Sequence, residues 1–115
     1  MIFVIEDDLS FAKCLELYLK PEKVKIFSNI IDATAALDDE LPSLIFLDVL
    51  LTGPDGFTLL NELISYPDTR KIPIIIVSSL DFSGKDLSDY GVVATLNKDV
   101  LTPKEIKSYA KRYSR

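Results

Sequence analysis

With 115 residues, of which 48% are hydrophobic, the chain has the size and composition of one globular domain with its own core. Its net charge of −5 argues against direct binding to nucleic acid, its apolar runs are too short to span a membrane, and the absence of histidine excludes Ser-His and Cys-His catalytic devices. We therefore expect a soluble, cytoplasmic protein whose chemistry depends on carboxylates, hydroxyls and lysine.

Five short runs of aliphatic residues predict five strands that are buried on both faces. In chain order they cover residues 2–5, 24–27, 44–47, 74–77 and 92–96. Stretches with helical spacing lie between and after them, so that a strand is followed by a helix five times over. Such alternation predicts an α/β fold with a doubly wound parallel sheet, because right-handed crossovers must cover both faces.

The helical stretches differ in what they suggest. Cys14 lies in the apolar pattern of the first, where a small buried hydrophobe without a catalytic role is the ordinary interpretation. The fourth helix is expected to be short, because Gly91 follows Ser78 by only 13 positions and Gly84 and Asp86 are poor helix formers. The basic residues of the last stretch are best explained as cations near the C-terminus of their own helix.

Polar residues end four of the five predicted strands. They are Glu6, Asp7 and Asp8 after the first strand, Asp48 after the third, Ser78 and Ser79 after the fourth, and Asn97 and Lys98 after the fifth. In a doubly wound sheet, ligands bind outside these carboxyl ends. Three carboxylates at one edge repel each other unless a cation or protons intervene, and oxygen-only ligands suit Mg²⁺.

Each of these residues also has an ordinary explanation. Asp8 is at least as well explained as a helix cap, Asp48 could start a turn, Ser78 could cap a helix, and Lys98 could be a solvated surface charge. Taken together, they suggest a carboxylate nucleophile whose phosphorylated form would be held by a lysine ammonium and a hydroxyl.

Four motifs carry a resemblance to the receiver domain of bacterial response regulators. They are IFVIEDDLS with its acidic pair, DVLLTGPDGFTLL around Asp48, IPIIIVSS ending at Ser78, and GVVATLNK ending at Lys98. The positions Asp7, Asp48, Ser78 and Lys98 are separated by 41, 30 and 20 residues. The resemblance covers essentially the whole chain, as a single receiver domain of residues 1–115.

The resemblance implies a flavodoxin-like fold with strand order 2-1-3-4-5 and a phosphorylation-controlled signalling switch. Asp48 would accept the phosphoryl group, Ser78 would be the switch hydroxyl, and Lys98 would be the paired lysine. Asp7, Asp48 and the backbone carbonyl of Leu50 would hold Mg²⁺, with Glu6 acting through water. A histidine kinase or a histidine phosphotransfer protein would donate the phosphoryl group, and the output would be contact with a downstream protein target that the sequence does not name.

Departures from the family pattern leave alternatives open. Thr95 stands three residues before Lys98, where the family usually carries an aromatic residue. Asp99 replaces the usual proline directly after Lys98, and Thr52 replaces the proline that the family usually has four residues after the acceptor Asp48. Together with the short fourth helix they motivate a pseudo-receiver, a phosphorylation-independent protein-interaction module. The third reading, a Mg²⁺-dependent phosphatase that forms an aspartyl phosphate, is opposed by Leu50, because such enzymes usually place a second aspartate there.

Two leucines bear on the lifetime of the aspartyl phosphate. Leu50 and Leu80 place apolar side chains where some relatives carry polar groups that position an attacking water. We therefore expect slow self-dephosphorylation, in a protein that catalyses only its own phosphorylation and dephosphorylation and has no turnover on a separate substrate.

Overall fold

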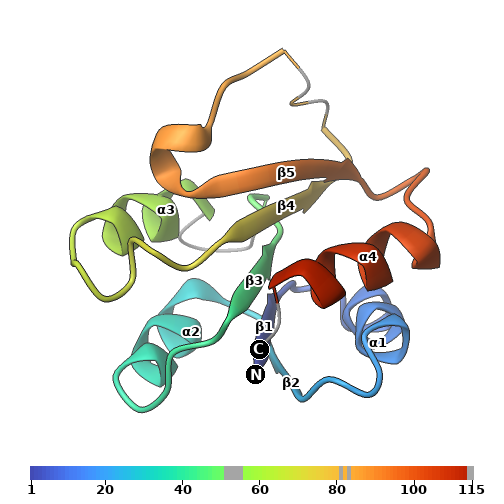
Figure 1. Cartoon of the computed structure of the whole chain (residues 1–115), viewed down its shortest axis with the longest axis horizontal. Helices are drawn as coiled ribbons and strands as arrows, with labels where there is room; N and C mark the ends of the chain where they lie inside the picture. The colour runs from blue at the N-terminus through green and yellow to red at the C-terminus, as the bar shows by residue number, and fades with distance from the viewer. Residues whose placement is uncertain (51–55, 81, 83, 114–115) are drawn as a thin grey trace.

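A computed structural model of the chain describes residues 1–50, 56–80, 82 and 84–113. Over these residues five parallel strands form one sheet in the order β2-β1-β3-β4-β5 (Figure 1). The strands are β1 (Ile2–Ile5), β2 (Val24–Phe27), β3 (Leu44–Leu47), β4 (Ile74–Ser78) and β5 (Val92–Asn97). The predicted sheet order is confirmed, and each strand agrees with its predicted range to within one residue.

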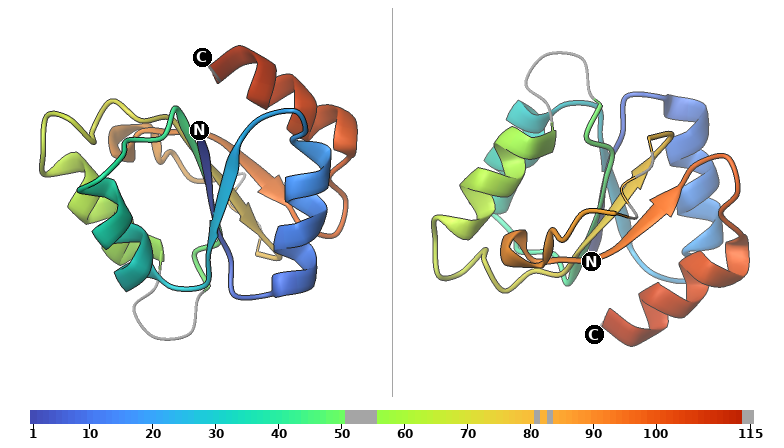
Figure 2. Two further views of the ribbon diagram at one scale, coloured as in Figure 1. Left: turned by 90° about the horizontal axis from the view of Figure 1, so that it is seen from below. Right: turned by 90° about the horizontal axis from the view of Figure 1, so that it is seen from above.

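Four helices and one short 3₁₀ turn connect and flank the strands within the described residues. They are α1 (Leu9–Tyr18), α2 (Ile30–Leu37), α3 (Gly56–Ile64), η1 (Ser88–Tyr90) and α4 (Pro103–Tyr113). Helices α2 and α3 cover one face of the sheet, and α1 and α4 cover the other (Figure 2). None of the helices in this part of the chain combines the length and the apolar character that crossing a membrane requires.

Alternate residues of the central strands point to opposite faces of the sheet and build two cores. On β1, Phe3 and Ile5 belong to the core under α2 and α3, whereas Ile2 and Val4 belong to the core under α1 and α4. Strands β1, β3 and β4 are buried along their whole length, as unbroken apolar runs predict.

The prediction of burial on both faces is wrong for the two outer strands. In β2, Lys25 is exposed and its neighbours are half-buried, and in β5, Val93 is exposed where a register shift interrupts the pairing with β4. Each of these strands lies at an edge of the sheet, where helices cover it incompletely and one side has no neighbouring strand.

The segment between β4 and β5 departs from the predicted repeat of five strand-helix units. Its described residues contain only the three-residue turn η1, which ends at Gly91 in the left-handed conformation at φ 81°. Phe82 is buried against the core under α3, with its ring centroid 6.2 Å from that of Phe57, and Leu87 and Tyr90 pack beside it. Among the described residues of this segment, a 3₁₀ turn therefore stands where a short fourth helix was expected.

Two smaller predictions concern single helices. Cys14 was expected to be buried, but it lies on the exposed side of α1, where Ala12, Leu15 and the following Leu19 face the core instead. Lys111 and Arg112 occupy the last turn of α4, as the interpretation of the basic residues at the C-terminus predicts.

Candidate functional site

The carboxyl edge of the sheet brings together the polar residues that end four strands. Strands β1, β3, β4 and β5 are successive neighbours, so that Glu6, Asp48, Ser78 and Lys98 leave the sheet side by side. The backbone hydrogen bonds continue past the strands: Asp48 N–H donates to the Ile5 carbonyl at 3.0 Å, and Lys98 N–H donates to the Ser78 carbonyl at 3.0 Å. These bonds fix the positions from which the side chains project.

Three carboxylates gather at this edge. One carboxylate oxygen from each of Glu6, Asp7 and Asp48 lies within 4.8 Å of the others. Glu6 and Asp48 are buried, at 2% and 6% exposure, whereas Asp7 is exposed. Such a set combines hard oxygen ligands from two strand ends with one side open to water, which is the environment that Mg²⁺ prefers because it keeps several waters.

Lys98 partly neutralises these carboxylates. Its ammonium Nζ lies 3.0 Å from Asp48 Oδ2 and also forms an ion pair with Glu6 Oε1. The lysine side chain is only 17% exposed, so the explanation as a solvated surface charge is wrong. The one positive charge of Lys98 faces two buried acids, so it balances the negative charge of the site only in part.

Glu6 shows the electrostatic cost of this arrangement. Its Oε2 accepts a hydrogen bond from the Asp8 backbone N–H at 3.1 Å, while Oε1 has the ion pair with Lys98 but no well-directed hydrogen bond within the described residues. Burial raises the pKa of Glu6 to about 7, because desolvation and the neighbouring Asp48 outweigh the lowering by Lys98 and the Asp8 N–H. A buried carboxylate oxygen such as Glu6 Oε1, without a well-directed hydrogen bond, fits a site that takes up a cation.

The pKa of Lys98 moves in the direction that keeps the ammonium charged. Desolvation lowers it, but the hydrogen bonds and charges of Glu6 and Asp48 together outweigh that effect, so the net pKa is raised. The Lys98 ammonium and the Asp48 carboxylate therefore form a charge-assisted hydrogen bond with little access to water.

Asp48 both starts a turn, as its ordinary interpretation predicts, and lies beside Lys98 at the polar edge of the sheet. Its Oδ1 accepts from the Leu50 backbone N–H at 2.9 Å, which is the hydrogen bond of an Asx-turn, while Oδ2 accepts from Lys98. The contact that ties Leu50 to the site is thus its N–H, and the role of its carbonyl as a metal ligand stays a prediction. Residues 51–55, which include Thr52 and part of the motif around Asp48, lie outside the described residues.

Asp8 takes the position that its ordinary explanation requires, whereas the described residues after Ser78 begin no helix that it could cap. The Ser78 side chain is fully buried, and its Oγ accepts from the Leu80 N–H at 3.2 Å. Asp8 is the N-cap of α1, where its side chain accepts from the Phe11 N–H at 3.2 Å. The cap interpretation is confirmed for Asp8, and the role of the Ser78 hydroxyl as a phosphoryl ligand stays a prediction.

Phe11 at the site escaped the sequence analysis. Its ring centroid lies 4.9 Å from Lys98 Nζ, within reach of a cation–π interaction. The available signal was the position of Phe11 in the first turn after the cap Asp8. Gly56, which belongs to the motif around Asp48, begins α3: a Cβ there would lie 2.6 Å from Val49 Cα and 3.1 Å from the Asp48 carbonyl oxygen.

Comparison with known protein families gives a match over nearly the whole chain. Residues 2–111 match the family described as the response regulator receiver domain. The response regulator PleD of Caulobacter vibrioides is 36% identical over 86 residues, which cover 72% of this chain and 19% of PleD. The chain therefore spans about a fifth of the length of this curated relative.

Solved structures show the same similarity. The signal receiver domain of a DNA-binding response regulator (merR) from Colwellia psychrerythraea 34H aligns with a TM-score of 0.82 at 27% identity, covering 99% of this chain and 98% of that one. The signal receiver domain of a signal transduction histidine kinase from Syntrophus aciditrophicus aligns with a TM-score of 0.82 at 28% identity, covering 97% and 87%.

Proposed function

The chain belongs to the response regulator receiver domain family, and we propose that it acts as a phosphorylation-controlled switch in which Asp48 accepts the phosphoryl group. The observation that carries the proposal is the convergence of Glu6, Asp7 and Asp48 within 4.8 Å, with the Lys98 ammonium 3.0 Å from Asp48. Family membership supports the general role of a two-component signalling domain, and these contacts support the assignment of residues.

In the proposed step, a carboxylate oxygen of Asp48 attacks the phosphorus of a phosphohistidine. The new O–P bond forms as the P–N bond breaks, and the imidazole leaves with the electron pair. Lys98, already hydrogen-bonded to Asp48, would stay beside the product and donate to an oxygen of the acyl phosphate. Ser78, at the end of the neighbouring strand, would supply its hydroxyl to another of these oxygens.

Mg²⁺ is the cofactor that the donor set fits best, and it would be held by Asp7 and Asp48, with the Leu50 carbonyl as a further ligand and Glu6 acting through water. When bound, it supplies positive charge for the phosphoryl oxygens and offsets the repulsion among the carboxylates. The chain's own contribution is to hold Asp48 by its backbone and by Leu50 N–H, so that one carboxylate oxygen is oriented before the donor arrives.

The surroundings of the site fit a protein donor, in our proposal a histidine kinase or a histidine phosphotransfer protein that meets this domain in the cytoplasm. Large apolar side chains are exposed within a few residues after β1, β3, β4 and β5: Leu9 at the start of α1, Leu50, Leu80 and Val100. Such a rim can be desolvated against a partner while the polar centre reacts. Leu50 and Leu80 would limit the approach of water, which is why we expect a long-lived aspartyl phosphate, and a half-life of seconds would contradict this point.

The test is intact mass after incubation with acetyl phosphate, with and without Mg²⁺, in parallel with Asp48→Asn. We expect one added phosphoryl group that requires both Mg²⁺ and Asp48. An equal gain in Asp48→Asn would place the acceptor elsewhere and overturn the assignment.

A pseudo-receiver is the second candidate, because the described residues between β4 and β5 contain a 3₁₀ turn where a short fourth helix was expected. A protein that is folded by circular dichroism and gains no mass would favour this candidate. In the first case the downstream partner would recognise the phosphorylated state, and in the second it would bind irrespective of phosphorylation.

A further inference from the structure

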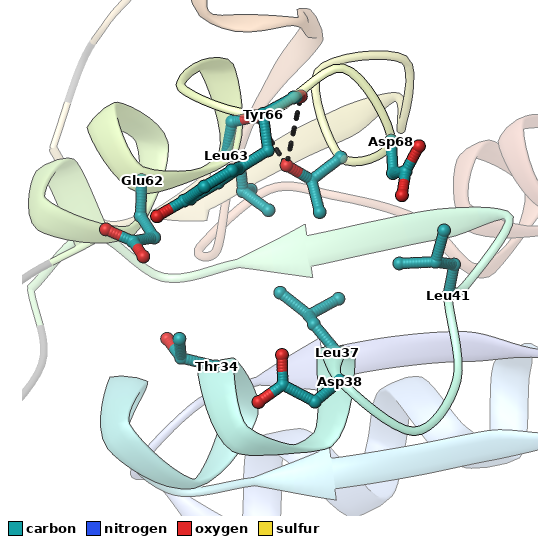
Figure 3. Close-up of a pocket in the computed structure, with 9 residues that line it drawn as sticks. Thr34, Leu37, Asp38, Leu41, Glu62, Leu63, Tyr66 and Asp68 are labelled. Atoms are coloured by element: carbon teal, nitrogen blue, oxygen red, sulfur yellow. Dashed lines mark hydrogen bonds between the residues drawn. The ribbon is translucent and has the colours of Figure 1, made fainter.

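A groove between α2 and α3 lies apart from the phosphorylation site. It encloses about 410 Å³, and Figure 3 shows residues of the two helices facing each other across it. We call it the α2–α3 groove and define it by the following residues: Leu37, Asp38, Leu41, Glu62, Tyr66 and Asp68. Several of them lie at or beyond the C-terminal ends of their helices, which in a parallel α/β fold places them near the edge of the sheet opposite Asp48.

The groove exposes apolar surface that the fold leaves uncovered. Tyr66 is 55% exposed and Leu41 is 47% exposed at its margins. A second hollow shares Thr34 and Glu62 with it and extends toward the start of α2, where Ile31 is 67% exposed. Together the two hollows make one apolar surface along α2 and α3, of the kind that marks a site for a protein partner.

The margin of this surface carries charge of one sign. Asp38, Glu62 and Asp68 line the groove, and none of the described residues that line either hollow is a lysine or an arginine. Anionic ligands such as nucleic acid or an acidic membrane surface would be repelled here. A partner that combines an apolar side chain with flanking cations would match both the floor and the margin.

We propose that the α2–α3 groove docks a basic segment of another protein, one that inserts a large apolar side chain between α2 and α3 and places lysine or arginine opposite Glu62 and Asp38. The groove lies away from Asp48, so this docking does not depend on the proposed phosphorylation. It would tether the domain to its partner in both states of the switch.

The most basic helix of a second copy is a poor match for the groove. Among the described helices, α4 carries the most cations: Lys104, Lys107, Lys111 and Arg112. The exposed positions of that helix hold no large apolar side chain, and its apolar residues Ile106 and Ala110 are buried against the sheet. A basic helix without an apolar anchor would satisfy the charges of the groove and leave Tyr66 and Ile31 uncovered.

The proposal can be tested with short random peptides displayed on phage and selected against the folded chain. We expect the enriched peptides to contain a large apolar residue next to lysine or arginine. Synthetic copies should bind the unmodified chain and Asp48→Asn equally, and should bind a Glu62→Lys/Tyr66→Ser variant at least about tenfold more weakly. The matched control, Asp89→Lys/Leu17→Ser, changes one exposed acid and one exposed apolar residue elsewhere and should bind like the unmodified chain.

Amide chemical shifts of the unmodified chain locate the peptide without relying on a variant. Perturbations along α2 and α3 support the proposal, and perturbations confined to other elements overturn it. Enrichment of acidic or uncharged peptides, or no enrichment at all, also overturns it. Sedimentation of the chain without peptide covers the remaining case: self-association that Glu62→Lys/Tyr66→Ser abolishes would assign the groove to a second copy and overturn the proposed partner.

Discussion

At the carboxyl edge of the sheet, charged side chains are held by buried strands, whereas the segment between β4 and β5 keeps its position through a few apolar side chains. Asp48 directly follows β3, whose four residues are all buried, and a backbone hydrogen bond ties it to Ile5. In the other region, Phe82 enters the core, and most of the other described residues of the segment are exposed.

The difference separates the groups proposed for the chemistry from the segment between β4 and β5. These groups lie at the ends of the three central strands and of β5, where Lys98 is tied to Ser78 by a backbone hydrogen bond. The segment between β4 and β5 carries none of the groups proposed for the chemistry apart from those at its junction with β4. It can therefore depart from a helix without disturbing the carboxylates.

The largest expected effect comes from removing one aromatic ring from each region. Phe46 on β3 is 1% exposed, and Phe46→Ala should lower the free energy of unfolding by about 3–5 kcal/mol because it leaves a cavity in the central core. Phe82→Ala should lower it by less than half as much, since the loop around Phe82 can collapse into the space. Urea denaturation measures both values, and equal losses would show that the segment between β4 and β5 is as firmly built as the sheet.

A glycine pair sharpens the same comparison. At Gly56 an added Cβ would meet Val49 Cα at 2.6 Å, so Gly56→Ala must shift the backbone beside Asp48 and should cost about 1–3 kcal/mol. At Gly84, between β4 and β5, an added Cβ meets nothing within 4 Å, so Gly84→Ala should change the stability by less than about 1 kcal/mol in either direction. Thermal unfolding gives both changes, and a neutral Gly56→Ala would contradict the close approach.

The strands and the polar edge could be predicted from the sequence because both depend on local, one-dimensional patterns. An unbroken apolar run such as residues 44–47 has few ways to be buried other than as a central strand, and the polar residue that follows must then lie at the edge. The positions of Asp48 and Lys98 follow from that logic alone. Their distance of 3.0 Å does not, since it depends on side-chain conformations that packing decides.

What the sequence did not reveal depends on rotation and packing in three dimensions. Cys14 and Leu15 are adjacent in one apolar pattern, and only the rotation of α1 against the sheet decides that Leu15 is buried and Cys14 is exposed. The contact between Phe11 and Lys98 joins residues that are 87 positions apart. The described residues between β4 and β5 form only the 3₁₀ turn η1, and the weak helix formers of this segment had indicated a helix that is short but not its replacement by such a turn.

Magnesium provides a prediction of intermediate size. At a concentration ten times its dissociation constant, a ligand that binds only the folded chain stabilises it by about 1.4 kcal/mol. We expect this gain with Mg²⁺ in the unmodified chain and expect Asp7→Asn to lose most of it, whereas the exposed Asp89→Asn near β5 should keep it. Urea denaturation with and without MgCl₂ measures the response, and an undiminished gain in Asp7→Asn would remove Asp7 from the ligand set.

The smallest expected effect tests whether Phe11 holds the Lys98 ammonium through its ring face. Fluorinated phenylalanines at position 11 keep the shape of the ring but withdraw electron density from its face. Each added fluorine should therefore weaken the cation–π interaction and lower the free energy of unfolding, by about 0.5–1 kcal/mol over the whole series. In a Lys98→Met background, which removes the cation, the free energy of unfolding should not change along the same series. A dependence of the unfolding free energy on the number of fluorines that persists without Lys98 would assign the effect to packing. A dependence that disappears without Lys98 would make the ring of Phe11 a part of the charged edge.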